Sequence, residues 1–422
     1  MKTYIQKLLT ISFMLFFIQS YSQIVTGYCG SARYDQEIFS GVTVTSDTAF
    51  GSNTDYTGAN VVLTMDIYEP TGDTASIRPL IVWAHGGSFI GGTKNDGDVT
   101  SLCNHFAKRG YVCASINYRL GMPVPPSQAS ASQAVYRAVQ DMKAAIRFFR
   151  KDAATVNTYR IDSNLVIAAG SSAGAFTALH LAYLNQPSEL PAGIDTTVIG
   201  SIEGNSGNPG YSSSVNAVVN LCGALGNKNW MVNGDIPLCS MHGTADNIVP
   251  YATAMLYILN IFPIMVVDGS YSVNNHADSI GVWNVMYTYY GASHVPYAGS
   301  IAYMDTTVRF VSNFLYQYMG CIPTDLNPLP NTFIQVSVPE LISPENDVSA
   351  YPNPASGYIL IDLKNSSAQK IELLDVTGRI VRNAENISAS HVRLDRGNLN
   401  AGIYFLKIIA NGKTTTRKIC FE

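Results

Sequence analysis

Between residue 60 and Cys321, short continuous apolar runs alternate with segments of helical periodicity. Runs of this kind are typical of strands buried on both faces of a sheet. The strand-like runs are 60–70, 79–85, 111–118, 164–170, 215–223 and 237–243. Residues 132–153 instead repeat apolar side chains every three or four positions, which predicts an amphipathic helix. The alternation predicts an α/β fold, with a mostly parallel sheet covered by helices on both faces.

After Cys321 the pattern changes. Prolines punctuate residues 322–346 too densely for a regular helix or a central strand, so we expect a linker there. Short alternating runs then follow, separated by Gly and Asn turns, at 358–363, 369–376 and 402–419. We therefore expect an α/β domain over residues 23–321 and a small all-β sandwich over residues 347–422.

The N-terminus has the pattern of a secretory signal. Lys2 and Lys7 precede an apolar run at 8–18, and small residues follow it up to Ser22. The run is shorter than the ~20 residues that span a bilayer, which argues against a membrane anchor. We expect residues 1–22 to be removed and the mature protein to have no stable membrane insertion.

Composition and cysteine spacing argue against two classes of partner, nucleic acid and zinc. Charged residues make up 13% of the chain and the net charge is -4, which argues against nucleic acid. The seven cysteines form no Cys-x-x-Cys pair, so disulfides in an exported chain are favoured over zinc. Leaving Cys420 aside, six cysteines allow three bridges. Cys222 with Cys239, on consecutive predicted strands, is the favoured pair, although the connectivity stays open.

The sequence Gly170-Ser171-Ser172-Ala173-Gly174 lies between a predicted strand and a predicted helix. Glycines two residues before and after a serine suit the tight turn that exposes a nucleophile. This frame selects Ser172 as the nucleophile and leaves Ser171 as a packing residue. Alone the motif is weak, because glycine-rich turns are common in this chain.

A second motif follows the predicted strand at 79–85. In His85-Gly86-Gly87-Ser88, the glycines leave backbone N–H groups free to approach a bound carbonyl. We expect the N–H groups of Gly87, Ser88 and Ala173 to form an oxyanion hole. His85 itself is interpreted as a residue that braces the loop.

A serine nucleophile needs a base and a carboxylate that orients it. Asp246 and His294 follow later apolar segments in the order Ser, Asp, His. Alternatives for the acid are Asp235, Asp268 and Glu203, and the alternative base is His276. The remaining histidines of this region are interpreted as structural; they are His105, His180 and His242.

These motifs together resemble the α/β-hydrolase superfamily, most closely its esterase/lipase branch, over residues 58–318. The resemblance implies a serine carboxylic-ester hydrolase that works through an acyl-enzyme and needs no metal or organic cofactor. Ser88 departs from the branch's commoner His-Gly-Gly-Gly but keeps a backbone donor. A serine peptidase of the prolyl-oligopeptidase type and a non-catalytic binding protein with this fold remain alternatives.

The tail resembles a different family, the sorting domains of proteins exported by the type IX secretion system of Bacteroidota. The matching blocks are 351–357, 371–381 and 399–408. The resemblance implies that outer-membrane machinery reads this domain, which is commonly removed. We therefore expect a secreted or cell-surface protein that passes through the periplasm.

The substrate is less constrained. Aromatic residues near the expected site suit acyl or phenolic groups, although core packing is the alternative for each. They are Phe89, Trp230, Tyr251, Tyr271 and Trp283. Feruloylated or acetylated glycans, lipid esters and polyesters all fit an exported protein of low charge.

Overall fold

A computed structural model describes residues 28–29, 32–191, 193–324, 332–333, 349–351, 353, 355–363, 368–376, 378–387, 391–410 and 413–421. The chain divides into a larger unit, Met1–Val336, and a smaller unit, Ser337–Glu422. The expected signal segment at 1–22 and most of the expected linker at 322–346 lie outside the described residues. Among the residues that are described, no helix combines the length and apolar character that crossing a bilayer requires.

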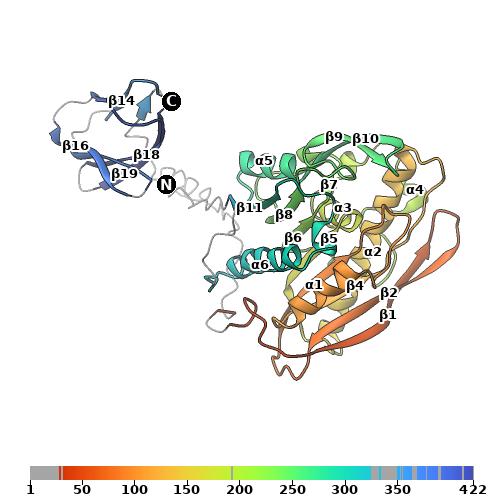
Figure 1. Ribbon diagram of the computed structural model, residues 1–422. Coiled ribbons are helices and arrows are strands. Elements are labelled where there is room, and N and C mark those ends of the chain that lie inside the picture. Colours follow the sequence, from red (N-terminus) through yellow and green to blue (C-terminus); the bar gives the residue numbers. More distant parts are fainter. Residues whose placement is uncertain are drawn as a thin grey trace, which may run out of the picture. The chain divides into compact units, whose positions relative to one another are not determined.

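The larger unit is built on one sheet with the strand order β1-β2-β4-β3-β5-β6-β8-β11-β12. The six strands from β4 to β11 run parallel, and β1, β2 and β12 pair antiparallel at the edges (Figure 1). This confirms the mostly parallel sheet. The strands are β1 Val42–Thr54, β2 Asn60–Pro70, β3 Arg78–Ala84, β4 Val112–Ile116, β5 Ile161–Ser171, β6 Ala217–Leu221, β8 Leu238–Gly243, β11 Asn284–Tyr289 and β12 Thr332–Phe333.

Helices cover both faces of this sheet, as expected. Successive residues of β3 point to opposite faces, so Val82 joins one apolar cluster with α2, α3 and α5, while Trp83 joins another with α1 and α6. The helices are α1 Gly97–Ala107, α2 Gln128–Ala154, α3 Ala173–Tyr183, α4 Thr196–Ile199, α5 Ser270–Ile280 and α6 Ile301–Tyr318, with short 3-10 turns η1 Pro187–Glu189, η2 Lys228–Trp230 and η3 Pro296–Ala298.

The order of the central strands creates a crevice. The chain leaves β3 to form β4 on one side and returns to form β5 on the other side. In open parallel sheets, ligands bind outside the carboxyl ends of the strands at such a switch point. The segments that follow β3 and β5 here are His85–Ser88 and Ser172, so the two sequence motifs meet in the crevice.

A hairpin that the sequence analysis did not anticipate follows β8. Strands β9, Thr253–Ile258, and β10, Phe262–Gly269, join β7, Ala224–Leu225, in a separate antiparallel sheet. Leu256 pairs with Met265 on the half-buried face, and Met255 pairs with Val266 on the exposed face. Both faces of this hairpin are apolar, which hides the period-two alternation by which strands are recognised.

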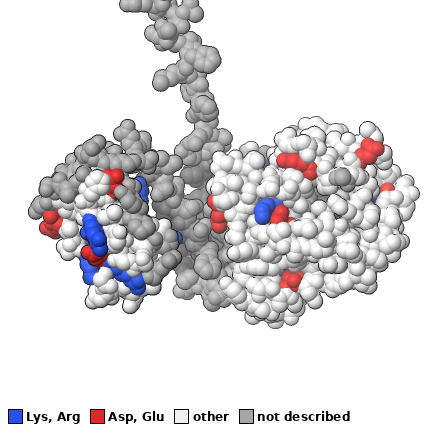
Figure 2. All heavy atoms as spheres, turned by 90° about the horizontal axis from the view of Figure 1, so that it is seen from above, with Lys and Arg blue, Asp and Glu red and all other residues white. Residues whose placement is uncertain are grey.

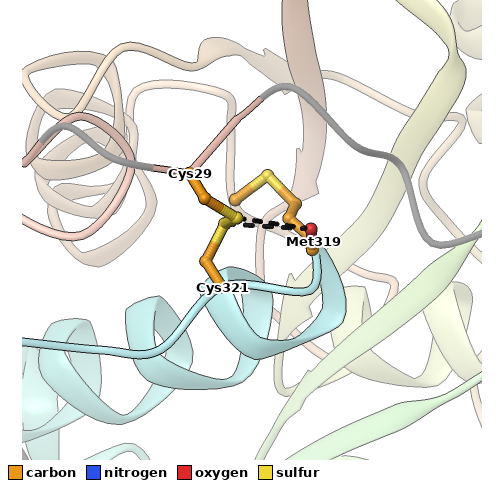
Figure 3. Close-up of a disulfide and its surroundings, with 3 residues drawn as sticks. All are labelled: Cys29, Met319 and Cys321. Carbon is orange, nitrogen blue, oxygen red and sulfur yellow. Dashed lines mark hydrogen bonds between the residues drawn. A yellow bond between two sulfur atoms is a disulfide. The ribbon is translucent and has the colours of Figure 1, made fainter.

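One disulfide joins Cys29 to Cys321, which follows α6, and both sulfur atoms lie about 4 Å from the Met319 carbonyl oxygen (Figure 3). The other five cysteines are free, so the expected three bridges and the Cys222–Cys239 pair are wrong. Cys239 lies opposite Val219 in the β6–β8 register. Cys222 is three residues further along, about 10 Å away at the rise of a strand, and a disulfide cannot span that offset.

The smaller unit confirms the all-β expectation. It contains two antiparallel sheets, β13-β14-β17 and β16-β15-β18-β19, and an apolar cluster that includes Ile361, Leu373 and Leu406. Its strands are β13 Ser349–Tyr351, β14 Tyr358–Asp362, β15 Ala368–Leu374, β16 Ile380–Ile387, β17 His391–Asp395, β18 Gly402–Ala410 and β19 Lys413–Phe421.

Candidate active site

Three side chains from separate loops form a continuous hydrogen-bonded chain at the carboxyl end of the sheet. Ser172 follows β5, Asp246 follows β8 and His294 follows β11. The His294 Nε2 atom lies 2.7 Å from the Ser172 Oγ, and its Nδ1 lies 2.6 Å from the Asp246 Oδ2. The arrangement gives the serine hydroxyl a base and gives that base a carboxylate on its far side.

The Asp246 carboxylate is held as an anion. Its Oδ1 accepts hydrogen bonds from the backbone N–H groups of Ile248 and Val249, both at 2.9 Å. Burial alone would raise the pKa of this carboxyl, but hydrogen bonds from His242 and His294 outweigh it and hold that pKa well below its ordinary value. The negative charge needed to stabilise a protonated His294 is therefore present across the neutral range.

The turn that carries Ser172 is sterically special. Ser172 precedes α3 with φ 53° and ψ -117°, a combination that non-glycine residues rarely adopt. A Cβ on Gly170 would lie 2.1 Å from the Gly174 carbonyl, and a Cβ on Gly174 would lie 1.9 Å from the Ala84 carbonyl oxygen. Both glycines are therefore required by close backbone contact.

The loop after β3 presents backbone donors beside this serine. Gly87, Ser88 and Phe89 all have positive φ, at 104°, 55° and 61°. Among the described residues, the N–H groups of Gly87 and Ser88 have no hydrogen-bond acceptor. The Ala173 N–H is the first of α3, a position at which a helix has no internal acceptor.

Contacts between buried aromatic rings hold the loop after β3 in place. The His85 ring stacks on Tyr118 with 4.4 Å between centroids, and its Nδ1 donates to the Gly86 carbonyl at 2.7 Å. Tyr118 donates its hydroxyl to the His85 carbonyl at 2.8 Å. These contacts fit the bracing role expected for His85.

Two family matches cover much of the chain. Residues 65–232 match the BD-FAE family, and residues 349–422 match the secretion system C-terminal sorting domain. The larger unit has the α/β-hydrolase fold, and its residues 65–232 match an esterase family. The sorting domain directs the hydrolase to the cell surface or the extracellular space through type IX secretion.

Individual relatives are more distant. The chain is 34% identical over 113 residues to carboxylesterase 3B of Mus musculus, a match that spans 26% of this chain and only 19% of the mouse protein. Esterase 2 of Thermogutta terrifontis phosphorylated by paraoxon is 22% identical, with a TM-score of 0.45, over 66% of this chain and 95% of its own. A truncated carbohydrate esterase from gut microbiota is 19% identical, with a TM-score of 0.46, over 67% of this chain and 98% of the esterase.

His242, for which the sequence predicts a structural role, is a second partner of Asp246. Its Nε2 lies 3.1 Å from the Asp246 Oδ2 and 3.2 Å from the Val249 carbonyl oxygen. Both neighbours are acceptors, so Nε2 carries the proton, and Nδ1 is 2.7 Å from the Ser270 hydroxyl. The available signal was its position near the end of β8, four residues before Asp246.

The neighbouring serine has different contacts. The Ser171 hydroxyl donates to Asp98 at 2.6 Å and lies 2.8 Å from the Tyr297 hydroxyl, whereas His294 contacts Ser172. Ser171 is thus part of a buried polar cluster, in keeping with the packing role expected for it.

The rival acids and the rival base lie in other networks of the hydrolase. Glu203 forms ion pairs with Arg147 and Lys143. Asp268 accepts hydrogen bonds from Thr253 and from the Lys228 backbone, Asp235 accepts from the Val232 N–H, and His276 contacts the Met231 carbonyl. None of these four joins the Ser172–His294 chain.

One group of described residues has the spacing of a metal site. The ligand atoms of Cys222, Asp246 and His294 lie within 4.8 Å of one another. Burial, followed by the nearby Asp246 charge, raises the pKa of the Cys222 thiol to about 12. Metals bind the thiolate, so a metal at this group would have to displace the thiol proton.

The aromatic residues predicted to contact the substrate lie in three separate parts of the larger unit. Phe89 packs against Tyr118 and Phe176, and Trp230 lines an apolar cavity beside α3. Tyr251 and Tyr271 stack in a different hollow, of about 230 Å³, between α5 and β11. Trp283 precedes β11, at the opposite end of that strand from His294, and packs against Phe314 and Tyr318 of α6.

Proposed function

We propose that the protein is a secreted serine carboxylesterase in which Ser172, His294 and Asp246 form the catalytic triad. The observation that carries the proposal is the chain of two hydrogen bonds, at 2.7 and 2.6 Å, from the serine hydroxyl through the imidazole to a buried carboxylate. The family match ends at residue 232, so for Asp246 and His294 this geometry is the support.

In the proposed reaction, the Ser172 Oγ attacks the ester carbonyl carbon while His294 Nε2 takes the hydroxyl proton. The imidazolium then gives this proton to the alcohol oxygen as the ester C–O bond breaks, and the acyl group stays on Ser172. A water molecule, deprotonated by His294, attacks the acyl-enzyme and releases the carboxylic acid. Asp246 stabilises the imidazolium in both halves of the cycle.

The oxyanion of each tetrahedral intermediate would accept hydrogen bonds from the N–H groups of Gly87, Ser88 and Ala173. The positive φ values of Gly87 and Ser88 and the position of Ala173 at the start of α3 support this assignment. Donors of this kind each contribute about 3 kcal/mol to barrier lowering in comparable sites.

The chain is poor in charged residues, which make up 13% of it. On the face of the larger unit in Figure 2, charged side chains are few and scattered among uncharged ones. Together with export, this supports esters on extracellular polymers or lipids, such as feruloyl or acetyl groups of glycans, polyesters and acyl esters.

Ser172→Ala tests the mechanism, with Ser171→Ala as the adjacent control. Hydrolysis of 4-nitrophenyl acetate should fall at least about a thousandfold in Ser172→Ala, because the nucleophile is lost. Ser171→Ala should retain turnover, and an organophosphate such as paraoxon should add one phosphoryl group at Ser172, located by peptide mass spectrometry. Activity that survives in Ser172→Ala and vanishes in Ser171→Ala would reverse the choice of nucleophile.

A panel of substrates distinguishes an esterase from a peptidase and from a non-catalytic binding protein. Methyl ferulate, acetylated xylan, a long-chain acyl ester and a peptide anilide are each offered to the full chain. Cleavage of the anilide alone would indicate a peptidase, and binding without turnover of any of them would indicate a non-catalytic protein.

A further inference from the structure

We propose that the apolar cavity between α2, α3 and the β9–β10 hairpin holds the acyl chain of the ester, and that it makes the enzyme prefer short linear acyl groups. This assignment rests on the proposed esterase function. The cavity has a volume of about 50 Å³, and its walls include Val135, Phe176, Trp230, Leu256 and Met265.

The main elements that wall the cavity begin at the catalytic end of the sheet. Helix α2 begins after the loop that follows β4, α3 begins after β5, the segment of Trp230 follows β6, and the hairpin follows β8. All four walls therefore start from carboxyl ends of parallel strands, as the triad does. The nearest wall is one helical turn from the nucleophile, because the Phe176 N–H donates to the Ser172 carbonyl at 3.1 Å.

Reaction geometry assigns the cavity to the acyl side of the ester. The tetrahedral carbon carries the Ser172 oxygen, the oxyanion, the alcohol oxygen and the acyl carbon. The alcohol oxygen must lie near His294 Nε2 to receive its proton, so the acyl carbon points away from that imidazole. The cavity walls contain no residue of the loops that carry His294 and Asp246 and include Phe176, which follows the nucleophile on α3.

Two titratable side chains line the cavity, Tyr136 and His180. The Tyr136 hydroxyl donates to the Gly200 carbonyl at 3.1 Å. Burial keeps His180 neutral. Its Nδ1 donates to the Phe176 carbonyl at 2.8 Å, and its Nε2 accepts the Gly226 N–H at 3.3 Å. Both ring nitrogens are therefore occupied by the protein, and the ring edge packs against Trp230 with 5.5 Å between centroids. Apart from the Ser132 hydroxyl, an alkyl chain in this cavity meets apolar groups and donors that are already bonded within the protein.

The size of the cavity sets an expected chain length. A volume of about 50 Å³ corresponds to about four water-sized or methylene-sized groups. Each methylene transferred from water into such a site changes kcat/KM about fourfold. We therefore expect kcat/KM to rise from acetate to butyrate or hexanoate and then to level off or fall.

The hairpin supplies a matched pair of variants. Met265→Trp fills the cavity, and Met255→Trp puts the same side chain on the exposed face of the same hairpin. We measure kcat/KM for 4-nitrophenyl esters from acetate to decanoate, and for methyl to hexyl acetates. Met265→Trp should lower the butyrate-to-acetate ratio at least about tenfold, equivalent to two methylenes. Met255→Trp should leave this ratio unchanged.

A second variant acts in the opposite direction. Trp230→Ala enlarges the cavity and should move the optimum to longer acyl groups. An unchanged acyl-chain preference in both Met265→Trp and Trp230→Ala would overturn the assignment. An effect confined to the alkyl acetates would also overturn it, because it would place the alcohol group in the cavity. Equal effects of Met255→Trp and Met265→Trp would trace the change to the hairpin as a whole. A wild-type protein that hydrolyses no ester would instead refute the proposed function.

Discussion

Acid should destabilise the larger unit through His180. This side chain is 6% exposed, and burial lowers its pKa to about 4, although the hydrogen bond to the Phe176 carbonyl acts in the other direction. In the unfolded chain the ordinary pKa is about 6.5, so between these values the unfolded state binds more protons. The stability contributed by neutral His180 is therefore complete above pH 6.5 and is lost as the pH falls toward 4.

The size of the effect follows from the two pKa values. At pH 4.5, a histidine shifted from about 6.5 to about 4 contributes a loss of about 2–3 kcal/mol relative to pH 7. His180→Asn cannot take up this proton, so wild type should lose about 2–3 kcal/mol more than the variant over that range.

Urea unfolding at pH 7 and pH 4.5, followed by tryptophan fluorescence, measures the difference. All three tryptophans, Trp83, Trp230 and Trp283, belong to the larger unit. Leu184→Ala removes another cavity wall residue while keeping His180, and it should show the wild-type pH dependence. Equal losses in wild type and His180→Asn would refute the reasoning.

Three further changes have defined outcomes. Replacing Cys29 and Cys321 together by Ala should lower the free energy of unfolding by about 2–5 kcal/mol in urea titrations, because the bridge closes a loop of 292 residues in the unfolded chain. Arg119→Met should cost about 3–5 kcal/mol in the same assay, since it leaves the buried Asp141 carboxylate without its cation. His242→Phe should lower kcat about tenfold with little change in KM, because the triad carboxylate loses a donor, and His242→Gln should restore part of the rate.

The order of elements in the larger unit was predictable because its strands are buried on both faces. Such strands appear as continuous apolar runs, and the helix at 132–153 had a clear period; it is α2, Gln128–Ala154. The edge strand β1 was missed because five successive residues, 43–47, are exposed and carry no apolar run. The hairpin was missed for the opposite reason, since apolar side chains on both of its faces hide the alternation.

The candidate triad was predictable from spacing, because strand ends in a parallel sheet meet at one edge. Contacts that depend on strand register were not predictable from the sequence. Cys222 and Cys239 are on neighbouring strands, yet the register places them three residues apart, whereas Cys29 and Cys321 come together from distant positions that no local pattern links. His242 was missed because its role depends on the fold of a turn rather than on its residue type.

The Cys29–Cys321 bridge also bears on how the exported protein is processed. It ties the start of the larger unit to the end of α6, and it lies before the sorting domain in sequence. A protease that cuts between residue 324 and residue 349 would leave both ends of this covalent loop joined. Removal of the sorting domain would then leave α6 anchored, and the loops that carry Ser172, Asp246 and His294 all lie inside the closed ring.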